Sequence, residues 1–172
     1  GLIVIKINKK YPLLRQAYNF DNFEQTGKQL IEQLSAYLIT QQLPESKANN
    51  WQAPEKELSY WKDYKFTNLN TFVNDLLNHS IHLHNPKYMG HQVSVPAPLS
   101  ILTNLISGTL NNGMAVYEMG KAATVIEKCV VDLFCHTIGY NEHSSGIMTS
   151  GGTLANLTAL LSARQSLKDS DI

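Results

Sequence analysis

Residues 145–167 have the sequence SGIMTSGGTLANLTALLSARQSL, and this stretch determines the fold class that we predict. Ser145 to Thr149 is short, partly β-branched and bounded by small polar residues, as is typical of a strand. A tight turn with two glycines follows, and a strong helical pattern extends from Leu154 to about Leu167. Strand, glycine turn and helix together predict the opening of a βα unit of an α/β fold, with no second strand in the chain to pair with the first.

The turn has the composition of an anion-binding site. Gly151 and Gly152 allow backbone N–H groups to point toward one position, and the helix beginning at Thr153 adds unpaired first-turn donors and a hydroxyl. This arrangement suits a phosphate, although the spacing matches neither a P-loop nor a GxGxxG turn. A helix capped by Ser or Thr after a glycine turn is the plainer interpretation of the same residues.

The remaining chain is predicted to be mainly helical. Residues 1–84 are expected to form an N-terminal helical arm with a linker at 43–57, and residues 85–172 the incomplete start of a large domain. The loop at 85–98 contains three prolines and a glycine, which exclude a regular helix. The helix at 99–110 is apolar on most sides and is therefore expected to be buried. The predicted helices upstream of the turn span 24–42, 68–83, 99–110 and 121–138.

Composition excludes several classes of protein. The 172 residues carry 14 Lys and Arg against 14 Asp and Glu, so the zero net charge gives no electrostatic affinity for nucleic acid or for an anionic membrane. Charged residues make up 16% of the chain, and only six lie within 88–163. That region is expected to form the core of the chain, or to face a second subunit or the rest of a longer polypeptide.

The cysteines and the N-terminal residues predict a cytoplasmic protein. Cys129 and Cys135 are six residues apart in a predicted helix, so they point in different directions and do not form a disulfide framework. The apolar run 1–5 ends at Lys6, well short of the roughly 7–15 residues of a signal sequence or the roughly 20 of a membrane span.

Two further features are candidate sites. The loop 85–92 (NPKYMGHQ) presents His91 and Gln92, which either bind a ligand or simply face solvent. Tyr117 lies in a short connector, where it either lines a pocket or packs as an ordinary buried tyrosine. Three histidines at 79, 82 and 84 lack neighbours at ligand spacing, and we predict no metal site there.

Three segments together resemble the N-terminal third of the group II pyridoxal-5'-phosphate (PLP) dependent decarboxylases. This family includes the glutamate, diaminobutyrate and aromatic amino acid decarboxylases. The resemblance covers about residues 68–168, and the glycine turn with its helix is its most specific part. The segments are NPKYMGHQ (85–92), NNGMAVYEMGKAATVIEK (111–128) and GIMTSGGTLANLTALLSARQ (146–165).

The resemblance implies a PLP-dependent transferase of fold type I (aminotransferase-like), of which this chain is the mainly helical N-terminal arm plus the first strand, turn and helix of the large domain. It also implies PLP as cofactor, an amino acid as substrate and a homodimer. Gly151, Gly152 and Thr153 would bind the PLP phosphate, and His91, Gln92 and Tyr117 would bind substrate. The pattern around Tyr117 favours glutamate or a related amino acid. Lys121 and Leu154 depart from the family pattern, which weakens the assignment to one branch.

The family's Schiff-base lysine, its acidic partner of the pyridinium nitrogen and its ring-stacking histidine all lie beyond Ile172. We therefore expect no catalytic residue in this chain, which would be an inactive segment of a decarboxylase. Two alternatives stay open. One is a truncated, non-catalytic paralogue that serves as a helical dimerisation or interaction module, and the other is a different fold type I enzyme, such as an aminotransferase.

Overall fold

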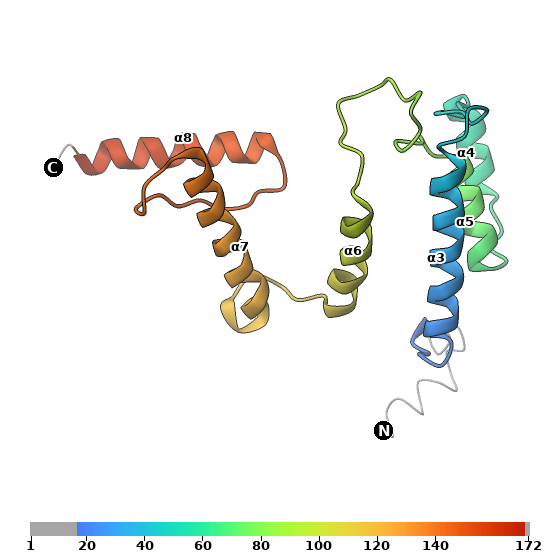
Figure 1. Cartoon of the computed structure of the whole chain (residues 1–172), viewed down its shortest axis with the longest axis horizontal. Coiled ribbons are helices and arrows are strands. Elements are labelled where there is room, and N and C mark those ends of the chain that lie inside the picture. The colour runs from blue at the N-terminus through green and yellow to red at the C-terminus, as the bar shows by residue number, and fades with distance from the viewer. Residues whose placement is uncertain (1–16, 171–172) are drawn as a thin grey trace. The chain divides into compact units, whose positions relative to one another are not determined.

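The computed structural model describes residues 17–170, and its compact units divide between Pro96 and Ala97. Residues 1–16, where the sequence predicts no targeting segment, lie outside the described part. The helices of the first unit are α3 (Phe23–Thr40), α4 (Pro54–Lys62) and α5 (Leu69–Asn78). Those of the second unit are α6 (Pro98–Leu110), α7 (Tyr117–Ile138) and α8 (Gly152–Ser170) (Figure 1).

In the first unit, α3 packs against α5. Gln33 on α3 reaches across this contact, and its side-chain amide donates to the Asn70 carbonyl at 2.8 Å and to Asn74 Oδ1 at 2.7 Å. The side chain of Asn68 caps α5 by accepting a hydrogen bond from the Thr71 N–H at 2.9 Å. Capping and packing together thus fix where α5 begins.

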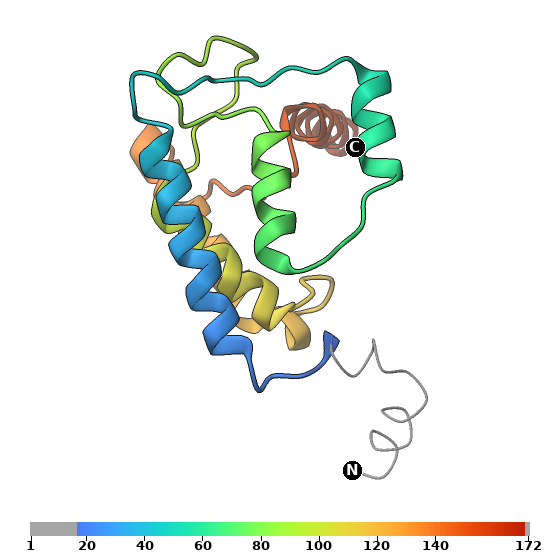
Figure 2. The same ribbon diagram turned by 90° about the vertical axis from the view of Figure 1, so that its right-hand side faces the viewer.

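Two predictions for this unit need correction. The predicted linker 43–57 is irregular only as far as Ala53, because Pro54 opens α4 and Glu57 lies in its first turn, both favourable at a helix start. Helix α5 ends at Asn78 and not at residue 83, since the His82 N–H bonds to the Ala48 carbonyl at 2.9 Å. Figure 2 shows the chain leaving α3 close to the loop that follows α5.

In the second unit, residues in the left-handed conformation end two helices where the sequence predicts. Asn111 has φ 44° and follows α6, and Gly139 has φ 93° and follows α7. Helix α7 begins at Tyr117, four residues earlier than expected, with non-helical geometry at Gly120. A side chain at Gly120 would place its Cβ 3.0 Å from the Gly113 oxygen and the Met114 Cα, so the close approach requires glycine.

The strand predicted at 145–149 does not form. The part of the chain that the structure describes is helical and contains no strand, because a strand needs a hydrogen-bonded partner and the neighbouring segments supply none. The segment instead lies against α7, where the Met148 N–H donates to Glu127 Oε1 at 2.8 Å and Gly146 lies beside Val131.

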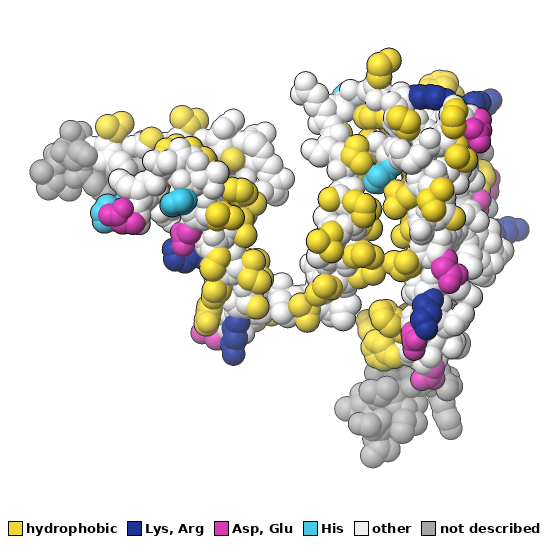
Figure 3. Space-filling view, viewed as in Figure 1, with side chains coloured by type: hydrophobic (Ala, Val, Ile, Leu, Met, Phe, Trp, Pro, Cys, Tyr) yellow, Lys and Arg dark blue, Asp and Glu magenta, His cyan; other side chains and the backbone are white. Residues whose placement is uncertain are grey.

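Helix α6 is exposed, although its sequence predicts burial. Leu99 is 73% exposed and Leu110 60%, and Val131 is the one buried hydrophobic residue within 17–167. Figure 3 shows apolar side chains along α6 and along α7. The low charge of 88–163 therefore corresponds to uncovered apolar surface and not to a core closed within the chain.

Candidate phosphate turn and substrate loop

The glycine turn lies at the open N-terminus of α8. The first helical hydrogen bond runs from the Ala155 N–H to the Gly151 carbonyl at 3.1 Å, so the N–H groups of the first turn before it have no intrahelical partner. The Thr149 hydroxyl donates to the same Gly151 carbonyl at 3.1 Å. Gly151, Gly152 and Thr153 are all exposed, and these donors are therefore accessible to a ligand.

The residues of this turn fit a phosphate group. A Cβ added at Gly151 or Gly152 would meet no atom within 4 Å, which leaves room directly in front of the backbone donors. No hydrogen bond within the described residues engages the Thr153 hydroxyl. Free N–H groups, a free hydroxyl and the positive end of a 19-residue helix are compatible with a phosphate dianion.

A hollow of about 560 Å³ lies between segment 145–149 and α8. Small side chains of α8, among them Ala155, Ala159 and Ser162, form one wall, and Ser145 and Thr149 belong to the other. Small residues at these positions keep the space beside the turn open.

Tyr117 is the first residue of α7 and is 58% exposed. The interpretation of Tyr117 as an ordinary buried tyrosine is therefore wrong within this chain. It belongs to the same unit as the glycine turn, whereas His91 and Gln92 belong to the first unit.

The loop with His91 and Gln92 is exposed but held in place. The Tyr88 hydroxyl donates to the His91 carbonyl at 3.2 Å, and the Val93 N–H donates to the same oxygen at 2.8 Å. The His91 and Gln92 side chains form no hydrogen bond within the described residues and are free to meet a ligand.

A polar cluster at the base of this loop follows from no local pattern in the sequence. Asn85, 3% exposed, donates to Gln41 Oε1 at 3.2 Å and to the Ser46 hydroxyl at 2.7 Å. The Lys87 ammonium donates to the carbonyls of Pro44 and Ser46. We call Gln41, Ser46, Asn85 and Lys87 the polar clasp. Its only signal in the sequence is Asn85 before Pro86, because its partners lie about 40 residues away.

The three histidines near the end of α5 have separate roles. His79 Nδ1 lies 2.9 Å from both carboxylate oxygens of Glu57, His82 Nδ1 lies 2.9 Å from the Tyr37 hydroxyl, and His84 Nε2 lies 3.3 Å from the Pro96 carbonyl. Burial lowers the pKa of His82 and raises that of Tyr37. Within the described residues, no group of His, Cys, Asp or Glu is arranged to hold a metal ion.

Aromatic residues join α4 to α5. The Tyr60 ring stacks on His79 with centroids 4.2 Å apart, and the Trp61 indole donates to Glu57 at 3.0 Å. The Tyr64 hydroxyl donates to Asp75 at 2.9 Å, and burial together with this bond raises the pKa of Tyr64 to about 12.

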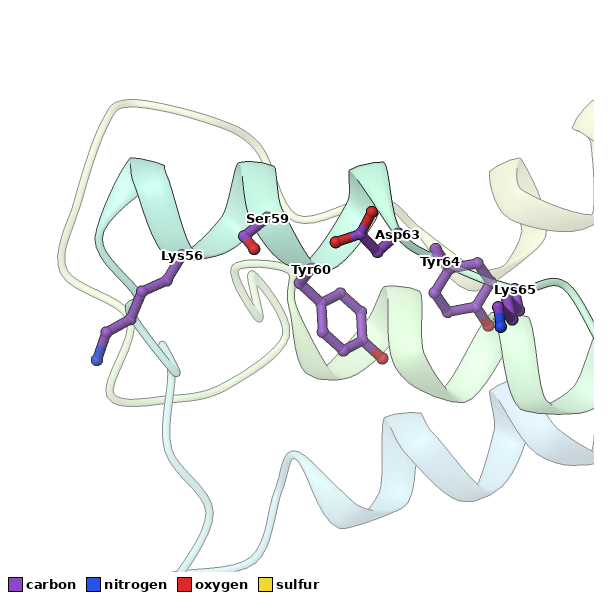
Figure 4. Close-up of a pocket in the computed structure, with 6 residues that line it drawn as sticks. All are labelled: Lys56, Ser59, Tyr60, Asp63, Tyr64 and Lys65. Carbon is purple, nitrogen blue, oxygen red and sulfur yellow. The ribbon is translucent and has the colours of Figure 1, made fainter.

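A shallow hollow lies beside α4. Figure 4 shows Lys56 and Lys65 at opposite ends of it, with Tyr60 and Tyr64 between them. Because these tyrosines take part in the contacts that join α4 to α5, we assign the hollow no function.

None of the helices within 17–170 is both long enough and apolar enough to cross a lipid bilayer.

Comparison with known proteins identifies relatives with one kind of activity. No family model matches the chain. An L-aspartate decarboxylase of Metarhizium robertsii is 32% identical over 96 residues, which is 55% of this chain and 19% of that protein. An L-2,4-diaminobutyrate decarboxylase of Acinetobacter baumannii is 27% identical over 56% of this chain and 19% of its own length.

An aromatic-L-amino-acid decarboxylase of Bacillus atrophaeus is 28% identical over 149 residues, which is 85% of this chain and 28% of that protein. The chain thus spans between about a fifth and a little over a quarter of the length of these relatives. The resemblance predicted from the three sequence segments is confirmed: the curated relatives of this chain are amino acid decarboxylases, consistent with the group II PLP-dependent family.

Proposed function

We propose that this chain is the N-terminal segment of a PLP-dependent L-amino acid decarboxylase of fold type I and supplies the phosphate turn, substrate contacts and part of a homodimer interface. The observation that carries the proposal is the open turn 151–153, in a chain whose curated relatives are amino acid decarboxylases. Its free donors and the space in front of them are what a phosphate requires.

Each residue has a distinct part in this proposal. The N–H groups of Gly151 and Gly152 and the hydroxyl of Thr153 bind the phosphate and fix the position of the cofactor. When bound, PLP supplies an electron sink for the electron pair left on the α-carbon as CO₂ departs. His91 and Gln92 orient the substrate through hydrogen bonds to its carboxylates, and Tyr117 forms part of the pocket wall.

For the substrate we propose glutamate or a related amino acid. The three relatives described above are decarboxylases of aspartate, diaminobutyrate and aromatic amino acids, so the choice of glutamate rests on the residues around Tyr117 and on His91. A ring N–H of His91 that donates to a carboxylate would favour an acidic side chain. Steady-state rates with glutamate, aspartate, diaminobutyrate and an aromatic amino acid would rank the candidates, and a preference for the aromatic one would contradict this choice.

We also propose that the chain alone does not decarboxylate amino acids. The lysine, acidic residue and histidine that the family uses for catalysis correspond to positions beyond residue 172. The exposed apolar residues of α6, including Leu99 and Leu110, support a contact with a partner subunit or with the rest of the parent enzyme.

The phosphate turn is tested by the substitution Thr153→Val in the parent enzyme. Loss of a hydroxyl bond to a phosphate should weaken PLP binding about 10- to 100-fold, which is the usual value of one hydrogen bond to a charged group. Binding is measured by titrating PLP into the apoenzyme and following the absorbance of the bound cofactor.

Thr158→Val provides a matched control on the same helix. The Thr158 hydroxyl donates within the helix to the Leu154 carbonyl at 2.8 Å and is therefore already satisfied. Its replacement should leave PLP affinity within about twofold of the wild type. Equal affinities for both variants and the wild type would show that Thr153 does not bind the phosphate.

A further inference from the structure

We propose that Asn85 and Tyr88 are positioning residues that hold the His91 backbone in one geometry while leaving its imidazole free for a ligand. The proposal deepens the proposed function, on which the substrate role of His91 rests. It concerns only contacts within the first unit.

Asn85 anchors the base of the loop. Its side-chain amide donates to Gln41, directly after α3, and to Ser46 in the loop that follows, and its Oδ1 accepts the Lys87 N–H at 2.9 Å. Asn85 is buried, with 3% exposure. Because a buried amide with three hydrogen bonds has little freedom to rotate, the loop starts from a fixed point.

A short series of contacts leads from Asn85 to His91. The Tyr88 N–H donates to the Asn85 carbonyl at 2.9 Å, which closes a turn and aims the tyrosine ring along the loop. The Tyr88 hydroxyl then donates to the His91 carbonyl, which also accepts from the Val93 N–H. The His91 carbonyl therefore accepts two hydrogen bonds, while the His91 side chain stays exposed.

Gly90 makes this arrangement sterically feasible. A Cβ at position 90 would lie 2.6 Å from the Tyr88 hydroxyl oxygen and 2.8 Å from the adjacent ring carbon. Any side chain there would displace the ring from the His91 carbonyl. Glycine at position 90 therefore leaves room for the Tyr88 ring to cross the loop.

This geometry matters for binding because a ligand-facing group is most effective when its position is fixed before the ligand arrives. A loop whose backbone fluctuates would have to be ordered by the ligand, which reduces affinity. An exposed imidazole on a fixed backbone avoids that cost. The contacts of Tyr88 are therefore expected to affect substrate binding through His91.

The first test is hydrogen exchange in the parent enzyme carrying Tyr88→Phe, which removes only the hydroxyl. Amide exchange at Val93 should become about two- to tenfold faster, the range expected for the loss of one hydrogen bond. Exchange in α3 and α5 should stay unchanged. Tyr140→Phe is the control, because the Tyr140 hydroxyl forms no hydrogen bond within the described residues. Unchanged exchange at Val93 in Tyr88→Phe would overturn the proposal, whatever the kinetics.

The second test separates positioning from structure by kinetics. Tyr88→Phe and Gly90→Ala should each raise KM for the amino acid substrate by about two- to tenfold and leave kcat within about twofold. In a His91→Ala background, Tyr88→Phe should have no further effect, because no imidazole remains to be positioned. Additive losses would contradict an action through His91.

The outcomes also distinguish this proposal from the proposed function. Faster exchange with unaltered kinetics in both Tyr88→Phe and His91→Ala would support the hold on the loop and overturn only the substrate role of His91. Faster exchange with coupled losses in KM supports both.

Discussion

Replacing Asn85 by alanine (Asn85→Ala) should loosen the contact between the end of α3 and the loop after α5. The substitution removes three hydrogen bonds from a residue that is 3% exposed, with donor–acceptor distances of 3.2, 2.7 and 2.9 Å. At about 0.5–1.5 kcal/mol each, and with the Gln41 oxygen left without this partner, the free energy of unfolding of the first unit should fall by about 2–4 kcal/mol.

Fluorescence during urea unfolding measures this loss, because Trp51 and Trp61, the two tryptophans of the chain, both lie in the first unit. Asn50→Ala is the control: Asn50 lies in the irregular segment after α3 and is exposed, and its side chain donates one bond of 3.3 Å to the Asn78 carbonyl. The control should cost below about 1 kcal/mol. A loss for Asn85→Ala no larger than that of the control would refute the idea that the polar clasp stabilises the unit.

Two further predictions concern pH and glycine. Burial lowers the pKa of His82, so the unfolded state binds more protons than the folded state below the ordinary histidine pKa of about 6.5; stability is therefore complete above that pH and falls as the pH decreases. Unfolding free energies measured between about pH 5 and about pH 8 should show this slope in the wild type and in the control His91→Gln. The slope should be smaller in His82→Gln. Equal slopes in all three proteins would contradict the prediction. Gly120→Ala should lower the melting temperature, at a cost of about 1–3 kcal/mol, because its Cβ would approach backbone atoms at 3.0 Å. Gly108→Ala on α6 has open space and should stabilise by about 0.5–1 kcal/mol, so a melting temperature that changes equally in both variants would be the contrary result.

The candidate site was predictable to the extent that it consists of local features. The open donors at Gly151 to Thr153 follow from two glycines before a helix, and the structure leaves them exposed. The free side chains of His91 and Gln92 likewise follow from a proline-containing loop. The contacts that hold this loop could not be predicted, since Asn85 finds Gln41 at a separation of 44 residues, and no periodicity relates the two.

By itself the sequence determined most of the helices and the C-terminal ends of α6 and α7, because hydrophobic periodicity and left-handed residues such as Gly139 act over a few neighbouring residues. It also determined the resemblance to amino acid decarboxylases, which rests on short motifs. Only the tertiary structure decided which segments contact each other and which stay exposed. Segment 145–149 has the composition of a strand but lies on α7 through Glu127, and α6 has the composition of a core helix but stays exposed. Both differences have one physical reason: strand pairing and burial depend on partner surfaces, which are a property of the packed chain and not of the local sequence.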